Sequence, residues 1–258
     1  MDSAIFRNLV RHEFKFKGSY KKSSRSQAAG KWWLAYSLLI LLMLTGTATY
    51  YAMHNELQIN SIWFVTMGFP YMVFFLSYGC MKREWENETY GWWLTMPYPR
   101  LELVSAKWLG SYLKVWVGII AVFFATSAYV LILSMVLPFY TLESVGSFMI
   151  TGINWLTLVA GLSPIIIALG LLASAVQSSV YRPISPIMWI VFMGGIAMIF
   201  QIPDSAISVN MMQQGTGHLK AEWFPYSWEL PLFMLLSWIL TYALLRLTAY
   251  LLEKKLDL

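Results

Sequence analysis

The sequence predicts an all-α polytopic membrane protein, and three observations support this fold class. Hydrophobic residues make up 58% of the 258-residue chain and charged residues 12%, which is about half the charged share of a soluble domain. The chain contains 13 tryptophans, 15 tyrosines and 15 phenylalanines, and such rings collect at membrane–water interfaces. Its apolar residues gather in runs of the length, about 20 residues, that a transmembrane helix requires.

Six apolar runs meet this length, and we expect each to form a transmembrane helix. They cover residues 32–52, 61–81, 108–137, 147–176, 187–202 and 229–250. The third and fourth runs are long enough to tilt or to project beyond the bilayer. The fifth is short, and at Pro203 we expect either a break or a re-entrant turn. The chain thus divides into an N-terminal segment, 1–31, and a six-helix transmembrane domain, 32–258.

The distribution of Lys and Arg predicts the topology, because cytoplasmic connections carry an excess of these residues. Eight basic residues precede the first run, and more follow the second, fourth and sixth runs. The loops on the opposite side hold only Lys220. Both termini are therefore expected in the cytoplasm of a multi-pass plasma-membrane protein. The net charge of +5 is explained by this topology, and no nucleic-acid partner is expected.

The N-terminal sequence SAIFRNLVRHEFKFK is predicted to form an amphipathic helix in the cytoplasmic membrane interface. Phe6, Leu9 and Val10 fall near one helical face, whereas Arg11 falls on another. The cations of such a helix lie near anionic lipid headgroups, so membrane lipids are expected partners. The alternative is a disordered basic tail that only sets the orientation of the first span. Residues 18–30 are expected to be a flexible link into that span.

The sequence contains few groups that could carry out chemistry. The only Gly-Lys pair, Gly30-Lys31, is followed by Trp32, so the chain lacks a phosphate-binding loop of the G-x-x-x-x-G-K-[ST] type. It has one cysteine and no H-E-x-x-H motif, and we predict no catalytic, metal or cofactor site. The middle of each predicted span lacks Asp, Glu, Arg and His, the groups that ion-coupled carriers use. If the protein transports a substrate, another subunit must supply the energy.

The connection KREWENETYGWWLTMPYPR, between the second and third runs, combines charges, tryptophans and prolines. Glu84 and Glu88 are four residues apart, which places both carboxylates on one face of a short helix predicted within residues 82–97. Trp85 lies on the adjacent face, where its indole can contact the membrane surface or an apolar groove. Pro97 then turns the chain towards the third span.

The order E-x-x-x-E-x-x-G-x-x-L-T-x-P-x-x-R, with a lysine seven residues later, resembles the first cytoplasmic loop of ABC-2 type transporter permeases. The matching residues are Glu84, Glu88, Gly91, Leu94, Thr95, Pro97, Arg100 and Lys107. The resemblance covers about 25 residues in motif and essentially the whole chain in architecture. In that family the loop carries a coupling helix, which docks in a cleft of a separate ATP-binding subunit. The tryptophan pair at 92–93 departs from the aliphatic residues usual there, and the alternative is a surface helix that tryptophans anchor.

The resemblance implies the membrane-spanning permease subunit of an ABC exporter, with an amphipathic or hydrophobic cargo such as a peptide, a lipid-like molecule or a drug. It implies a separate ABC ATPase subunit, which would bind the ATP, and a second permease copy or a paralogue. The 177–186 connection would be a second contact with the ATPase, or else a plain proline turn. The 203–228 loop would form re-entrant helices, or else a polar loop. The alternative function is a non-transporting immunity, scaffold or sensor protein that binds a cytoplasmic partner through the same loop.

The predicted topology can be tested by labelling single cysteines in a Cys80-free background with a membrane-impermeant thiol reagent. The cytoplasmic set is positions 20, 90, 180 and 255, and the external set is positions 57, 142 and 215. We expect the external set to react in intact cells and the cytoplasmic set to react only in opened membranes. External labelling at position 90 would contradict both the topology and the cytoplasmic placement of the coupling loop.

Overall fold

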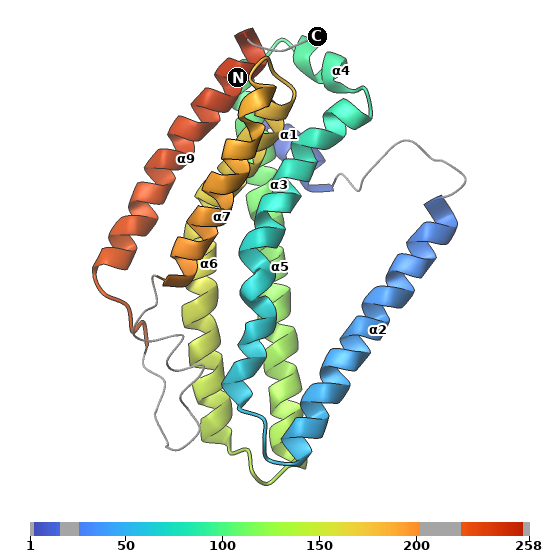
Figure 1. Ribbon diagram of the computed structural model, residues 1–258, viewed down its shortest axis with the longest axis vertical. Helices are drawn as coiled ribbons and strands as arrows, with labels where there is room; N and C mark the ends of the chain where they lie inside the picture. Colours follow the sequence, from blue (N-terminus) through green and yellow to red (C-terminus); the bar gives the residue numbers. More distant parts are fainter. Residues whose placement is uncertain (1–2, 16–25, 202–222, 255–258) are drawn as a thin grey trace.

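The computed structural model describes residues 3–15, 26–201 and 223–254, and every regular element in these ranges is a helix (Figure 1). The α-helices are α1 (Ser3–Lys15), α2 (Ser26–Met53), α3 (Phe69–Glu86), α4 (Tyr90–Thr95), α5 (Arg100–Val136), α6 (Leu142–Gln177), α7 (Ser185–Gln201) and α9 (Glu229–Lys254). Two 3-10 helices, η1 (Ile59–Gly68) and η2 (Arg182–Ile184), precede α3 and α7. The predicted all-α fold class is confirmed.

Five segments are long and apolar enough to cross a membrane, judged by length and composition. They are Leu34–Met53, Ile59–Glu86, Arg100–Val136, Leu142–Gln177 and Glu229–Lys254. The remaining predicted run forms α7, whose 17 residues reach about 26 Å, somewhat less than a hydrocarbon core of about 30 Å. Five of the six spans are therefore supported, and a crossing by α7 remains a prediction. The expected break at Pro203 and most of the 203–228 loop lie outside the described residues.

Two helices begin earlier than the apolar runs predicted. Helix α2 begins at Ser26, so the last part of the expected flexible link is helical, while residues 16–25 lie outside the described ranges. Helix α5 begins at Arg100, before its apolar run, as expected from Pro99, which can precede a first helical turn and is followed by good helix formers. This early start places Lys107 inside the helix.

Helix α6 is the centre of the bundle, and α3, α5 and α9 pack around it (Figure 1). In its most apolar 18-residue stretch 78% of the residues are buried, whereas 0% are buried in the corresponding stretch of α2. Figure 1 shows α2 inclined away from the bundle and joining it at one end. There the Thr49 and Tyr129 hydroxyls lie 2.9 Å apart, which connects α2 to α5.

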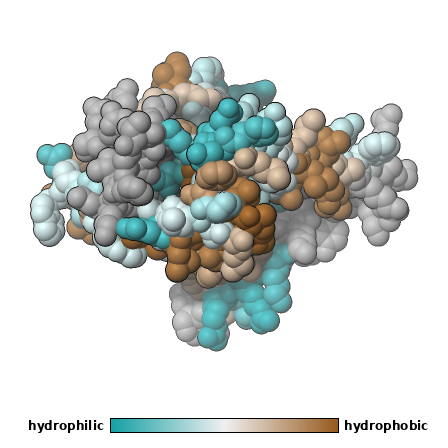
Figure 2. All heavy atoms as spheres, turned by 90° about the horizontal axis from the view of Figure 1, so that it is seen from below, coloured by the Kyte–Doolittle hydropathy of each residue, from teal (hydrophilic) through white to brown (hydrophobic). Residues whose placement is uncertain are grey.

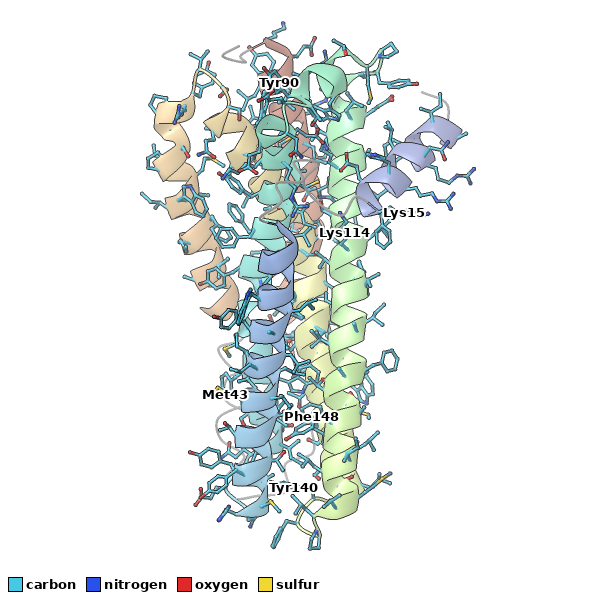
Figure 3. The ribbon with its side chains drawn as sticks, turned by 90° about the vertical axis from the view of Figure 1, so that its right-hand side faces the viewer. Lys15, Met43, Tyr90, Lys114, Tyr140 and Phe148 are labelled. Atoms are coloured by element: carbon cyan, nitrogen blue, oxygen red, sulfur yellow. The ribbon has the colours of Figure 1, made fainter. Side chains whose placement is uncertain are left out.

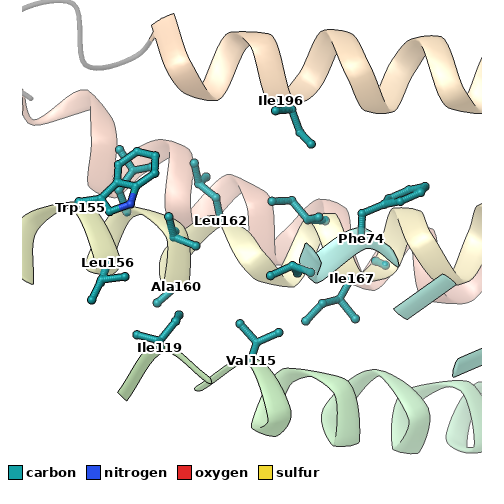
Figure 4. Close-up of a cluster of buried hydrophobic side chains, with 14 of the residues drawn as sticks. Phe74, Val115, Ile119, Trp155, Leu156, Ala160, Leu162, Ile167 and Ile196 are labelled. Carbon is teal, nitrogen blue, oxygen red and sulfur yellow. The ribbon is translucent and has the colours of Figure 1, made fainter. Parts of the chain in front are cut away.

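Glycines let α3 and η1 approach α6 closely. A Cβ atom at Gly170 would lie 2.7 Å from the carbonyl oxygen of Phe74, and one at Gly152 would overlap the ring of Trp63. Trp63 donates a hydrogen bond from Nε1 to the Phe148 carbonyl at 3.0 Å. Gly170 therefore permits close approach of α3 and α6, and Figure 4 shows part of the buried apolar cluster of the bundle.

Pro164 lies inside α6, where it leaves the Ala160 carbonyl without its usual amide donor. The Ser163 hydroxyl donates to that carbonyl at 2.8 Å. Trp108 of α5 donates from Nε1 to the Pro164 carbonyl at 3.1 Å. Neighbouring donors therefore satisfy the backbone around the proline, as the low polarity of a membrane interior requires.

The surface of the bundle is largely apolar. Figure 2 shows apolar side chains across the face that is seen from below, and many large hydrophobic residues of α2, α5, α7 and α9 are exposed. Lipid is the solvent that suits such a surface. Helix α1, helix α4 and the last turns of α9 lie at the same end of the bundle (Figure 1), and Tyr140 lies at the opposite end (Figure 3). This arrangement agrees with termini on one side, which we expect to be the cytoplasm.

The close approach at Gly170 generates a stability prediction. We expect Gly170→Ala to lower the free energy of unfolding by about 1–3 kcal/mol, because the added methyl group must force α3 and α6 apart. Gly118→Ala on α5 is the matched control, since nothing lies within 4 Å of a Cβ atom at that position. Thermal unfolding of the purified proteins in one detergent measures both. Equal stability of the two variants would contradict the packing described.

Candidate functional site

The described residues bring three charged side chains together at the end of the bundle that carries α4. Lys107 of α5 donates from Nζ to Glu13 Oε1 of α1 and to Glu84 Oε1 of α3, each at 2.6 Å. The Lys107 side chain is 0% exposed, and the two glutamate side chains are 12% and 16% exposed. A buried charge is costly unless it is paired, so this cluster fixes α1, α3 and α5 relative to one another.

Helix α1 reaches Lys107 because it lies directly against α5. Gly110 makes room for it, since a Cβ atom there would lie 2.9 Å from Cβ of Glu13. Val10 is buried, Phe6 and Leu9 are half-buried, and Arg11 is exposed. The predicted apolar face of α1 therefore packs at least partly on the bundle, where the sequence led us to expect contact with the membrane surface.

Helix α4 covers the cluster with an aromatic ring. Trp93 is buried, and the centroid of its ring lies 5.1 Å from Nζ of Lys107, within the range of a cation–π interaction. Trp85 stacks on Tyr90 with ring centroids 4.8 Å apart. Trp93 thus connects α4 to the bundle and Trp85 joins α3 to α4. Lys107 of α5 contacts three other helices, α1, α3 and α4.

The predicted helix over the 82–97 segment is wrong in one respect, because the chain turns within it. Helix α3 ends at Glu86, and Glu88 has a φ of 59°, in the left-handed region that commonly ends a helix. The amides of Glu88 and Thr89 donate to the carbonyls of Trp85 and Glu84 at 3.2 and 2.9 Å, which is the Schellman pattern. Glu84 and Glu88 therefore do not share one helical face.

The turn also decides what each carboxylate does. Glu84 Oε2 accepts a hydrogen bond from the Thr89 hydroxyl at 2.5 Å while Oε1 binds Lys107, so Glu84 points into the protein. Glu88 is exposed. The expectation that both carboxylates face a partner is corrected for Glu84, which is a structural residue of the cluster.

Helix α4 presents a second face away from the cluster. Gly91, Thr95 and Pro97 are exposed, and nothing lies within 4 Å of a Cβ atom built at Gly91. Met96 has the extended ψ of 137° that a following proline favours. Arg100 begins α5, and its Nη1 atom is buried without a hydrogen-bond partner in the described part of the protein. These residues surround an open, largely uncharged surface on α4.

Sequence reasoning missed Glu13 and Cys80. Glu13 follows Leu9 by four residues, so an acid on the apolar face of the N-terminal helix was the available signal. The Cys80 thiol donates to Glu13 Oε2 at 3.5 Å, and only the fold brings these residues together. None of the hydrogen bonds or ion pairs described for this cluster involves the 177–186 connection, which holds η2. The described residues contain no group of three potential metal ligands.

In comparisons with known proteins, no protein-family model matches the chain, and no curated protein or solved structure shows significant similarity to it. The interpretation of the site therefore depends on its geometry and on the motif in the loop.

The cluster around Lys107 generates the third prediction. We expect Lys107→Met to lower the free energy of unfolding by about 3–5 kcal/mol, because it leaves two partly buried carboxylates without their cation. Adding Glu13→Gln and Glu84→Gln should recover part of this loss, since the repulsion between the carboxylates disappears. Thermal unfolding in detergent measures each variant.

The control for this experiment is Lys82→Met, which removes an exposed pair with Glu86 at 3.3 Å. Such surface pairs contribute about 0.3–0.5 kcal/mol. If Lys107→Met were as mild as Lys82→Met, the cluster would not hold the four helices together.

Proposed function

We propose that the protein is the membrane-spanning permease subunit of an ABC-2 type transporter, and that helix α4 is its contact with a separate ATPase subunit. One observation carries this proposal. The short helix in the motif-bearing loop has an open outer face at Gly91, and its inner face is fixed through Trp93 to the buried Lys107. A partner that bound the outer face would act directly on α1, α3 and α5.

The geometry supports transmission of force along α5. Helix α5 has 37 residues and is about 55 Å long at 1.5 Å per residue. It begins three residues after Pro97 and contains Lys107. A displacement of α4 would therefore move a rigid helix that extends from this end of the bundle towards the other. A loop that only anchored the protein to the membrane surface would have no need of such a connection.

The remaining parts of the proposal follow the resemblance. The ATPase subunit binds and hydrolyses ATP, because this chain lacks a phosphate-binding loop. The permease pairs with a second copy or a paralogue in the plasma membrane, with both termini in the cytoplasm. Its cargo is amphipathic or hydrophobic, in keeping with the apolar and aromatic character of the spans.

The proposal is tested by placing a large side chain on the open face of α4. Gly91→Trp should abolish co-purification of an ABC ATPase with the tagged chain, because the indole blocks close approach while the surrounding space lets the chain fold. Gly118→Trp, on the exposed side of α5, is the matched control and should retain the ATPase. Mass spectrometry identifies the ATPase by its phosphate-loop peptide.

Three results would contradict this function. The first is ATP binding by the purified chain alone, which we expect to be absent. The second is equal recovery of the ATPase with both variants. The third is recovery of no ATPase with the unaltered chain, which would favour the scaffold, sensor or immunity alternative.

A further inference from the structure

A groove lies between α5, α6 and α9, on a part of the molecule that the proposed function does not use. Its volume is about 320 Å³. It is centred on the middle of α5 and α6, the two longest helices, where residues 112–124 face residues 153–161, and Met234 of α9 contributes one edge. The groove therefore lies at the depth of the hydrocarbon core if these helices span the bilayer.

The groove exists because the two helices present side chains of different size. Helix α6 contributes the small residues Thr157 and Ala160, whereas α5 contributes the rings of Trp116 and Phe123. Figure 4 shows Ile119 of α5 facing Leu156 and Ala160 of α6, which form the floor. Small residues opposite rigid rings leave a space between helices that otherwise pack closely.

One end of the groove is closed and one side is open. Tyr112 stacks on Trp108 with centroids 5.5 Å apart, and both rings meet the edge of Trp238 at 5.8 Å. These rings join α5 to α9 at the end nearer Lys107. Trp116 is 40% exposed and Phe124 is 66% exposed, so the groove opens towards the surroundings of the bundle.

The lining restricts what can occupy the groove. Among the described residues that line it none is charged, and their side chains offer hydrogen-bonding groups only at Tyr112, Trp116 and Thr157. A cavity of about 150 Å³ holds benzene, so twice that volume suits part of a flexible hydrocarbon chain, which gains dispersion contacts with every ring it touches.

We propose that this groove binds one hydrocarbon chain of a membrane lipid, with the chain lying along α5 and α6 and ending at the rings of Tyr112 and Trp238. The groove fits an apolar, unbranched hydrocarbon chain, whichever headgroup the lipid carries. This inference does not depend on the proposed transport function, because it uses only the lining and the depth of the groove.

The proposal is tested with a phosphatidylcholine that carries a photoreactive diazirine in the middle of one acyl chain. The full-length protein is reconstituted in phosphatidylcholine vesicles, illuminated and mapped by peptide mass spectrometry. We expect the lining residues Trp116, Phe123 and Thr157 to react at least about fivefold more than Val117 and Ile132. The last two are 55% and 60% exposed, so ordinary contact with lipid would favour them.

Variants at Thr157 supply the matched controls, because this residue is exposed and a change there does not disturb buried packing. Thr157→Trp should fill the groove and lower the reaction at Trp116 by about fivefold, whereas Thr157→Ala and Val117→Trp should leave it unchanged. Thermal unfolding verifies that all three variants fold.

Two outcomes would overturn the proposal. Equal reaction at lining and control positions, or no effect of Thr157→Trp, would mean that the groove is only part of the general lipid contact. Formation of a disulfide between copies by Thr157→Cys, in a Cys80-free background, would mean that a second copy covers it.

Discussion

The end of the bundle that carries α4 depends on one buried cation. Lys107 has no exposed surface and is neutralised by Glu13 and Glu84, while Trp93 covers it. Taking these charges out of water is favourable only when all partners are in place. The positions of α1, α3, α4 and α5 are therefore coupled, and a displacement of one of these helices must either carry the others along or expose an unpaired charge.

A different constraint holds the rest of the bundle. Because lipid is as apolar as a leucine side chain, burial of apolar surface does little to bring transmembrane helices together, and close packing of small residues replaces it. Helix α6 shows this at Gly152 and Gly170, where η1 and α3 approach its backbone. Where the small residues Thr157 and Ala160 of α6 and the large rings of α5 line the same space, the helices leave the groove that we assign to a hydrocarbon chain.

These two regions suggest a division of roles along the bundle. The charged cluster and α4 form a stiff end that is suited to receive force from a partner. The apolar middle exposes its surfaces to lipid. Helix α2 is almost free of packing contacts, so it is the helix that can most easily exchange one packing partner for another. In the proposed transporter the charged cluster and α4 would couple to ATP hydrolysis. The apolar middle and α2 would contact the second permease copy, the lipid and the cargo.

The sequence by itself determined the helical class, five of the candidate spans and the loop that carries the motif, because helix length and apolar runs are local properties that the bilayer thickness sets. It also marked Lys107. It could not place Glu13 beside Lys107, since the two residues are 94 positions apart. Nor did it show that the chain reverses at Glu88, where no glycine signals the left-handed turn. Only tertiary structure decided that Glu84 points inward, because a buried lysine attracts any carboxylate that the packing of helices brings within reach.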